Sequence, residues 1–325
     1  MPLFLTDADV NASFDWNSAI AELRRAYAAP NKPAMFPPRT MARGDGFWLR
    51  TLSGVNPSDG LMGAKLIAAS PRNRRGSYLI SLFDQETVEL VALLDGGSIT
   101  AFRTAATSAL AADLLAPARP LSVGVIGSGL EAQMHLRALS AVREIKAARV
   151  FSPNPASRQR YVEKLADLGV PISPTESGRA AVAGVDLVIC AARSRDETPT
   201  LIGEWLADGV TVISIGSTLP EQREIDTSVV TRAGVIVADM VEEVANDTGD
   251  MLAARQAGID FETRLISLTD AIVDPNRASA GSGLRLYKSV GAALQDLTIA
   301  GMCVARARKA SLGTELPVSI APVLK

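Results

Sequence analysis

A glycine-containing segment in the middle of the chain has the residue types and the spacing of a phosphate-binding turn. Gly127, Gly129 and Ala132 follow the apolar run 122–126 in the pattern G-x-G-x-x-A. Gly127 permits a sharp turn, Gly129 lets the backbone approach a pyrophosphate, and Ala132 lets the next helix pack closely on the strand. Because a helix N-terminus attracts anions, the segment predicts binding of NAD(H) or NADP(H). The alternative is an ordinary glycine-rich turn between a strand and a helix. The residues expected to contact the cofactor here are Gly127, Ser128, Gly129, Leu130 and Glu131.

The end of the next apolar run bears on which dinucleotide is bound. In NAD-binding proteins an acidic residue at this place usually accepts hydrogen bonds from the ribose hydroxyls. This chain has Ser152 and Asn154 there, with Arg158 shortly after and no acidic residue in 151–158. Because a guanidinium pairs well with a phosphate, Arg158 favours NADP(H) over NAD(H). The alternative is that Arg158 is a solvated helix residue and that Ser152 or Asn154 contacts the ribose of NAD.

Apolar runs that alternate with helical segments predict the domain that carries this turn. Continuous apolar strands separated by helices are typical of a parallel sheet covered on both faces. We therefore expect an α/β domain of Rossmann type, with a doubly wound parallel sheet. The expected strands are 122–126, 148–151, 186–191, 210–215, 235–239 and 265–268, and helices are expected at 130–141 and 156–168.

The first third of the chain has a different pattern. Short apolar runs lie between Gly, Pro, Asn and Asp residues, as in antiparallel strands. The expected strands are 3–5, 46–52, 63–69, 78–83 and 88–94, and helices are expected at 15–28, 98–115 and 290–308. We therefore expect a mixed α+β substrate-binding and dimerisation domain at 1–116 and about 302–325, and an NAD(P)-binding Rossmann domain at 117–301.

The composition narrows the classes of function. The 325 residues are 47% hydrophobic and 21% charged, which suits a globular chain of two domains. A net charge of −2 without a basic stripe argues against nucleic acid as a partner. Cys190 and Cys303 have no metal or redox spacing, and the one histidine, His135, excludes a histidine-rich zinc site. No apolar run reaches the roughly 18 residues of a membrane span, so we expect a cytoplasmic protein without a membrane partner.

Five segments together resemble the ornithine cyclodeaminase/mu-crystallin family. They occur in the order found in the family and extend over most of the chain. The most specific are Thr-Ala-Phe-Arg-Thr-Ala-Ala at 100–106 and Arg-Glu-Ile-Asp at 223–226. The five segments are 63–66, 94–109, the glycine turn with His135 downstream, 215–226 and 286–296.

The resemblance implies a homodimer built through the first domain, with NAD(P)(H) bound by the second. It also implies that Arg39, Lys65 and Arg103 surround the carboxylate and the reacting nitrogen of the substrate, and that Asp226 is the acid/base. The residues implied to seat the cofactor, besides those of the glycine turn, are Arg103, Thr104, Gly216, Ser217, Thr218 and Ser289.

The residues by themselves leave alternatives for these roles. Lys65 interrupts an apolar strand, so it lies either on the wet face of that strand or in the interior for a purpose. Asp226 precedes Thr227 and could be a helix N-cap. Arg39 could be an ordinary surface arginine, whereas Arg103 is unusual because its helix is rich in alanine and its neighbours are expected to be buried.

The chemistry that these residues permit is the reduction of an α-imino acid. Arg39 and Arg103 can clamp a carboxylate so that the substrate C2 faces the nicotinamide. Lys65 can polarise the substrate, and Asp226 can exchange a proton with its nitrogen. We therefore predict an NAD(P)H-dependent oxidoreductase that converts a cyclic ketimine such as Δ1-pyrroline-2-carboxylate, or a keto acid plus an amine, into the amino acid.

Two other functions are compatible with the resemblance. One is ornithine cyclodeaminase, which forms proline and ammonia from ornithine, and the other is NADP-dependent ligand binding without turnover, as in mu-crystallin. Ornithine-specific members hold the distal amine with an acidic side chain on the strand before Lys65. Here that strand, 46–53, has no carboxylate and contains Arg50. A cation at this place argues against ornithine and favours a substrate side chain that is apolar or acidic.

Overall fold

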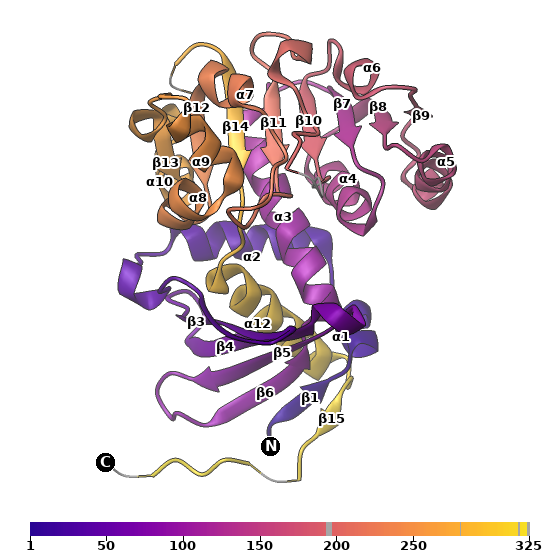
Figure 1. The fold of residues 1–325 in the computed structure, drawn as a ribbon. Coiled ribbons are helices and arrows are strands. Elements are labelled where there is room, and N and C mark those ends of the chain that lie inside the picture. Colours follow the sequence, from indigo (N-terminus) through magenta and orange to yellow (C-terminus); the bar gives the residue numbers. More distant parts are fainter. Residues whose placement is uncertain (193–196, 280, 318, 324–325) are drawn as a thin grey trace. The chain divides into compact units, whose positions relative to one another are not determined.

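A computed structural model of the protein describes residues 1–192, 197–279, 281–317 and 319–323. The chain forms two compact units, Met1–Arg103 with Ala292–Lys325 and Thr104–Gly291 (Figure 1). These boundaries differ from the expected ones at 116/117 and about 301/302. The first lies inside helix α3 (Gly97–Leu115), not at its end. The second precedes helix α12 (Ala293–Lys309), because the whole of this helix belongs to the first unit, where it packs on strands and helices.

A mixed sheet forms the frame of the first unit. Its order in the described chain is β15-β1-β6-β5-β4-β3-β2. The pairs from β2 to β6 are antiparallel, as the sequence predicted for β3 to β6, whereas β2 was not predicted; β1 is parallel to β6. The strands are β1 (Leu3–Leu5), β2 (Thr40–Gly44), β3 (Phe47–Val55), β4 (Leu61–Ser70), β5 (Arg75–Asp84), β6 (Leu90–Asp95) and β15 (Thr314–Glu315).

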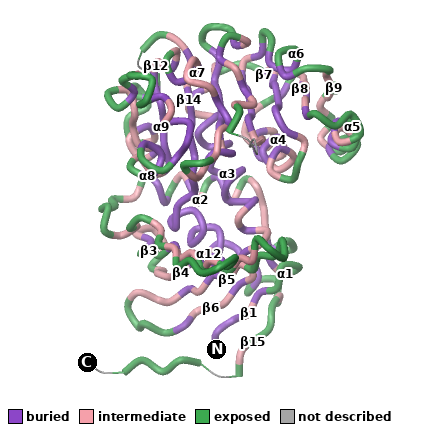
Figure 2. The backbone as a smooth tube through the Cα atoms, viewed as in Figure 1, coloured by how far each residue is buried: buried purple, intermediate pink, exposed green. Residues whose placement is uncertain are grey.

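Helix α12 covers one face of this sheet and packs against β3, β4 and β5. Leu52, Lys65 and Ile80 lie side by side on neighbouring strands and are buried beneath it. A Cβ at Gly63 would lie 1.9 Å from the backbone oxygen of Ser81 on β5 and 3.2 Å from Leu297 of α12, so the glycine lets the neighbouring strand and the helix approach closely. Figure 2 shows the helix as a buried element. The other helices of this unit are α1 (Asp7–Ser13) and α2 (Trp16–Ala28).

A parallel sheet forms the second unit, as expected for a doubly wound Rossmann-type fold (Figure 1). Its order in the described chain is β13-β12-β14-β11-β10-β7-β8-β9, and every one of these pairs is parallel. The strands are β7 (Leu121–Ile126), β8 (Ile145–Phe151), β9 (Ile172–Pro174), β10 (Leu187–Cys190), β11 (Thr211–Ser214), β12 (Ala233–Ala238), β13 (Leu265–Ser267) and β14 (Leu284–Lys288).

Strand β14 was not predicted, although it lies in the middle of the sheet between β11 and β12. Arg285 and Lys288 interrupt its apolar sequence, and Lys288 is nevertheless completely buried. The helices of this unit are α4 (Leu130–Val142), α5 (Pro155–Lys164), α6 (Gly178–Val182), α7 (Thr227–Arg232), α8 (Val241–Asp247), α9 (Gly249–Gln256), α10 (Leu268–Val273) and α11 (Pro275–Ala278). In the part of the chain that the structure describes, no helix is long and apolar enough to cross a membrane.

Candidate active site

Three buried charges from three different elements meet in the first unit. The Lys65 ammonium of β4 lies 2.9 Å from Oδ1 of Asp296 in α12, and the Arg103 guanidinium of α3 donates to the same oxygen at 3.1 Å. Lys65 and Asp296 are completely buried and Arg103 nearly so. The alternative of a solvent-exposed Lys65 is therefore wrong. Because burying ions is costly, a carboxylate shared by two cations is needed to keep both of them in this interior.

A second row of polar side chains holds the Arg103 guanidinium in place. Arg103 donates to Oε1 of Gln295 at 2.8 Å, and the Gln295 amide donates to the Tyr27 hydroxyl at 2.8 Å. Gln295 is completely buried and Tyr27 almost so. Two neighbouring residues of α12, Gln295 and Asp296, therefore orient Arg103. Sequence reasoning assigned no role to either, because polar residues in the first turn of a helix are usually solvated.

The surroundings of Lys65 adjust its acidity towards the neutral range. Burial lowers the pKa of its ammonium to about 8, against the opposing effect of the Asp296 carboxylate. The positive charges of Arg103 and Arg39 lower this pKa further. Arg39 directly precedes β2, whose first residue pairs with Thr51, so it lies at the level of Leu52 beside Lys65. A cation with this pKa remains protonated at neutral pH and can still release its proton, as a general acid must.

Arg50 lies on the same face of the sheet as Lys65, one row further along the strands. It pairs with Ile67, two residues after Lys65, and Ile67 pairs with Tyr78. The Arg50 guanidinium is 5.2 Å from the centre of the Trp48 ring, and the Lys65 ammonium is 5.7 Å from that of Tyr78. Cations beside aromatic faces are stabilised by the ring electrons. This face of the sheet therefore combines positive charge with aromatic surface.

In the second unit, the glycine turn has the geometry that its sequence predicts. Gly127 has φ +108°, and a Cβ there would lie 2.5 Å from the carbonyl oxygen of Ala191, so other residues would be strained. A Cβ on Gly129 would meet nothing within 4 Å, which leaves room for a group to approach. Gly129 is also the N-cap of α4, and it supplies no side-chain hydrogen bond to the first turn. The turn therefore fits the pyrophosphate of a dinucleotide, held by the N-terminal N–H groups of α4.

The residues after β8 that were expected to contact the cofactor also contact other parts of the chain. Ser128 donates to the Ser152 hydroxyl at 2.9 Å, and Asn154 caps α5 by accepting from Ala156 and Ser157. The buried Arg158 guanidinium donates to the Thr175 carbonyl and lies 5.6 Å from the centre of the Phe151 ring. The solvated alternative for Arg158 is therefore wrong. Arg158 therefore connects α5 to the segment after β9. This structural role weakens the case that Arg158 contacts the 2′-phosphate of NADP(H).

Further predicted cofactor residues lie at the ends of β11 and β14. The loop that contains Gly216 is closed by Gln222, whose carbonyl accepts from the Ser217 hydroxyl and whose side chain accepts from the Thr218 N–H. Ser289 donates to Asp239 at 2.6 Å. Of the remaining predicted cofactor residues, Thr104 is buried in the middle part of α3, Leu130 is exposed at the start of α4, and Glu131 is half-buried in the first turn of α4.

Asp226 has the capping role that the sequence left open as an alternative. Its carboxylate accepts from the Val229 N–H at 3.1 Å and so begins α7. It also accepts from the Gly203 N–H at 3.0 Å and from the Ser228 hydroxyl at 2.8 Å. A carboxylate with these three donors is occupied in holding backbone. We therefore propose Lys65, rather than Asp226, as the acid/base.

Known proteins resemble the chain over nearly its whole length. Residues 6–311 match the model of the ornithine cyclodeaminase/mu-crystallin family. Delta(1)-pyrroline-2-carboxylate reductase of Paracoccus denitrificans (strain Pd 1222) is 28% identical over 314 residues, which cover 92% of this chain and 95% of that protein. Iminosuccinate reductase of the same organism is 26% identical over 272 residues, which cover 82% of this chain and 83% of that protein.

A solved structure extends this likeness to the fold. Thermococcus litoralis Delta(1)-pyrroline-2-carboxylate reductase, in complex with NADH and L-proline, has a TM-score of 0.86 and 26% sequence identity. The match covers 97% of this chain and 100% of that one. The chain therefore belongs to the ornithine cyclodeaminase/mu-crystallin family.

Proposed function

We propose that the protein is an NAD(P)H-dependent oxidoreductase that reduces an α-imino acid to the corresponding amino acid. The substrate is a cyclic ketimine such as Δ1-pyrroline-2-carboxylate, or the imine of a keto acid with an amine. The observation that carries the proposal is the buried cluster of Lys65, Arg103 and Asp296, which contains a proton donor with a pKa of about 8. The reductase names of the relatives and the phosphate-binding turn at Gly127 support it.

In this proposal Arg39 and Arg103 hold the substrate carboxylate, and Lys65 donates its proton to the imine nitrogen. A dinucleotide held at the phosphate-binding turn of Gly127 and Gly129 would supply the hydride that C2 accepts. Loss of the proton leaves Lys65 as a neutral amine, which regains a proton from water before the next turnover. Oδ2 of Asp296 is buried and has no hydrogen-bond partner among the described residues, so it can accept from the N–H of the protonated imine. The products are the amino acid and the oxidised cofactor.

The substrate side chain in this proposal is apolar or acidic. Arg50 adds a third guanidinium to the face that bears Lys65, and β3 contains no carboxylate. Such a face repels the distal ammonium of ornithine and attracts a second carboxylate. The cyclodeaminase function is therefore not the one that we favour.

A direct assay tests the proposed activity. We expect the purified protein to oxidise NADPH or NADH when it is given Δ1-pyrroline-2-carboxylate, Δ1-piperideine-2-carboxylate, or pyruvate or oxaloacetate with ammonia or methylamine. The absorbance of the reduced cofactor reports the reaction. Failure with every acceptor, together with formation of proline and ammonia from ornithine, would instead establish the cyclodeaminase. Failure in both assays with retained cofactor binding would indicate a ligand-binding protein.

We further propose that NADP(H) is preferred to NAD(H). The support is the lack of an acidic residue in 151–158, since a carboxylate there would repel a 2′-phosphate. Replacing Ser152 by Asp should therefore lower the ratio of kcat/KM for NADPH to that for NADH by at least about tenfold, a like-charge effect of about 1.4 kcal/mol. Gln159→Asp adds the same charge on the exposed part of α5 and should change the ratio little. A wild-type protein that uses NADH better would contradict the preference.

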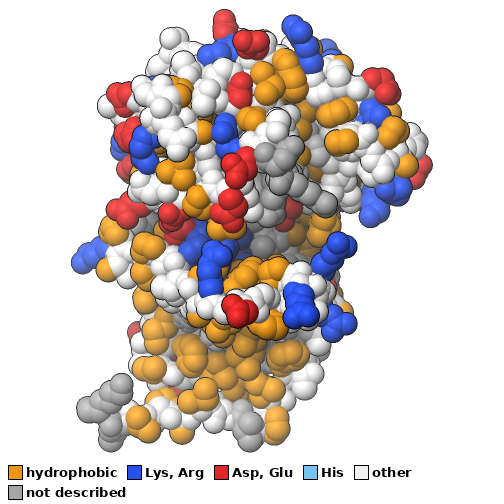
Figure 3. Space-filling model, viewed as in Figure 1, with side chains coloured by type: hydrophobic (Ala, Val, Ile, Leu, Met, Phe, Trp, Pro, Cys, Tyr) orange, Lys and Arg blue, Asp and Glu red, His pale blue; other side chains and the backbone are white. Residues whose placement is uncertain are grey.

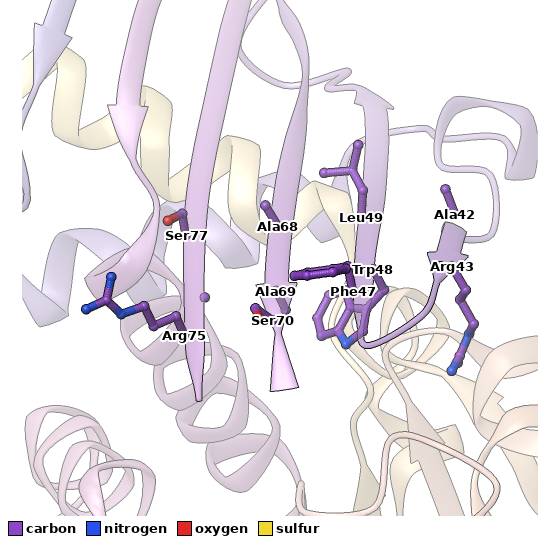
Figure 4. A pocket seen from close by; sticks show the side chains of 12 residues that line it. Ala42, Arg43, Phe47, Trp48, Leu49, Ala68, Ala69, Ser70, Arg75 and Ser77 are labelled. Carbon is purple, nitrogen blue, oxygen red and sulfur yellow. The ribbon is translucent and has the colours of Figure 1, made fainter. Parts of the chain in front are cut away.

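A homodimer through the first unit is also part of the proposal. The sheet face opposite α12 exposes large apolar side chains, with Phe47 55%, Leu49 44% and Leu79 38% exposed. Figure 3 shows hydrophobic side chains gathered over β4 to β6. A hollow of about 560 Å³, lined by β2 to β5, adjoins Phe47 and Leu49 (Figure 4). Because an antiparallel sheet normally presents polar side chains to water, this face suits a second copy of the chain.

A further inference from the structure

The second unit contains a buried chain of alternating charges that the proposed reaction does not use. The Lys288 ammonium lies 3.1 Å from Oδ2 of Asp250 and 3.0 Å from the Ser214 hydroxyl, and Ser214 donates to Oε2 of Glu224 at 2.6 Å. Arg223 extends the chain, with its Nε 3.4 Å from Oδ1 of Asp250. Ser214, Glu224 and Lys288 are completely buried, and the Asp250 side chain is too. Two buried carboxylates, the buried Lys288 ammonium and the partly buried Arg223 guanidinium thus balance one another in charge.

The burial of these groups is costly, and each carboxylate is held by several partners at once. Burial raises the pKa of the Glu224 carboxyl, while the charge of Lys288 and the hydrogen bonds from Ser214 and Gly216 lower it. Asp250 also accepts from the backbone N–H groups of residues 224 and 225. The Glu224 carboxylate is therefore held firmly in one position by its neighbours.

Glu224 connects the loops that follow two adjacent strands. Its Oε1 accepts from the Ala192 N–H at 2.9 Å, shortly after β10, and its Oε2 accepts from the Gly216 N–H at 2.8 Å, shortly after β11. A Cβ on Gly216 would lie 2.3 Å from Oε1 of Glu224, so only glycine lets the backbone come this close. Both contacts lie at the carboxyl edge of the parallel sheet.

Ligands of open parallel sheets bind at this edge, in the loops that follow the strands. Gly216 also begins the segment Gly216-Ser217-Thr218, which the resemblance assigns to the cofactor. We propose that Glu224 is a positioning residue for the dinucleotide, which sets the spacing of the backbone at Ala192 and Gly216. Ser214, which accepts from Lys288, orients this carboxylate, and Asp250 holds the backbone N–H groups of residues 224 and 225. The inference rests on the proposed dinucleotide cofactor and goes beyond it, since Glu224 itself need not touch the cofactor.

Cofactor titrations on three variants test this inference. Glu224→Gln replaces one acceptor oxygen by an NH2 group, and Glu224→Asp withdraws the carboxylate by one methylene, so neither can accept from both backbone N–H groups. Because hydrogen bonds to charged groups are among the stronger ones, each should raise the Kd of NADPH at least about tenfold. Thr211→Val is the matched control. It removes a buried hydroxyl that donates to the Leu115 carbonyl at the other end of β11, so it should lower the Tm and leave the Kd unchanged.

The readouts separate positioning from general stability. The Kd is measured by nicotinamide fluorescence at a temperature at which circular dichroism shows each variant to be folded. With saturating NADPH, kcat in the Glu224 variants should recover, because the loss is in cofactor affinity. A folded Glu224→Gln or Glu224→Asp with an unchanged Kd would overturn the inference, as would a Thr211→Val variant with an equally raised Kd. If the wild-type protein binds neither NADPH nor NADH, the proposed function fails first.

Discussion

Replacing Lys65 by Met is expected to reduce imine reduction by a factor of about 10²–10⁴, the usual contribution of a positioned proton donor. Met has a similar length and an apolar side chain, so it fills the buried space on β4 without supplying a proton. The effect should lie in kcat/KM for the imino acid at saturating NADPH. Cofactor binding should be unchanged, because the phosphate-binding turn belongs to the second unit.

Two controls make the Lys65 result interpretable. Lys146→Met removes a lysine that is exposed on the surface and should leave the kinetics unchanged. Lys65→Arg retains the positive charge, but a guanidinium does not release its proton in this pH range, so it should rescue little of the activity. If Lys65→Met retains activity within a few-fold of the wild-type protein, another group donates the proton. Asp226 would then return as a candidate.

Local sequence was sufficient to predict some strands of the parallel sheet and not others. Strands such as β7 and β10 are buried on both faces, so their apolar residues are continuous and identify them without further information. Strand β14 is equally central, but Lys288 interrupts its apolar pattern. That lysine is acceptable in the interior only because Asp250, from a distant part of the chain, supplies the opposite charge. Spatial partners of this kind are not visible in local periodicity.

Sequence motifs predicted only part of the candidate site. Lys65, Arg103 and the glycine turn stand in segments typical of the family. Asp296 is separated by 231 residues from Lys65, and its position in a helical first turn is typical of a surface charge. Arg158 is a second case of an unforeseen neighbour, since its type and place suggest a phosphate contact and its guanidinium lies 5.6 Å from the centre of the Phe151 ring. Residue type alone does not reveal which neighbour a side chain contacts.

Asp296→Asn is expected to change both the pKa of Lys65 and the stability of the protein. The substitution removes the carboxylate shared by Lys65 and Arg103. Burial lowers the pKa of Lys65 to about 8, and the Asp296 carboxylate opposes this effect. Without that negative charge the pKa of Lys65 should fall further, by about 1–3 units for an opposite charge at this distance. The variant should also be less stable by about 3–5 kcal/mol, because two cations lose their buried partner.

The pH dependence of kcat/KM for the imino acid follows from the sign of this shift. Reduction requires Lys65 in its protonated form, so the activity of the wild-type protein should decline as the pH rises through about 8. In Asp296→Asn the same decline should occur at a lower pH, and the activity at pH 8 should be mostly lost. Activity should return in part as the pH is lowered towards 6, a recovery that a merely unfolded variant would not show.

The profile is measured at saturating NADPH and at a temperature at which the variant is folded by circular dichroism. Asp167→Asn is the matched control, because it neutralises an exposed carboxylate that pairs with Arg137 and should not move the decline. A wild-type decline that stays in place in Asp296→Asn would contradict the assignment of Lys65 as the titrating proton donor. A decline displaced to higher pH would show that the carboxylate acts on a different group. The expected displacement to lower pH therefore depends both on the identity of the acid and on the contact between Asp296 and Lys65.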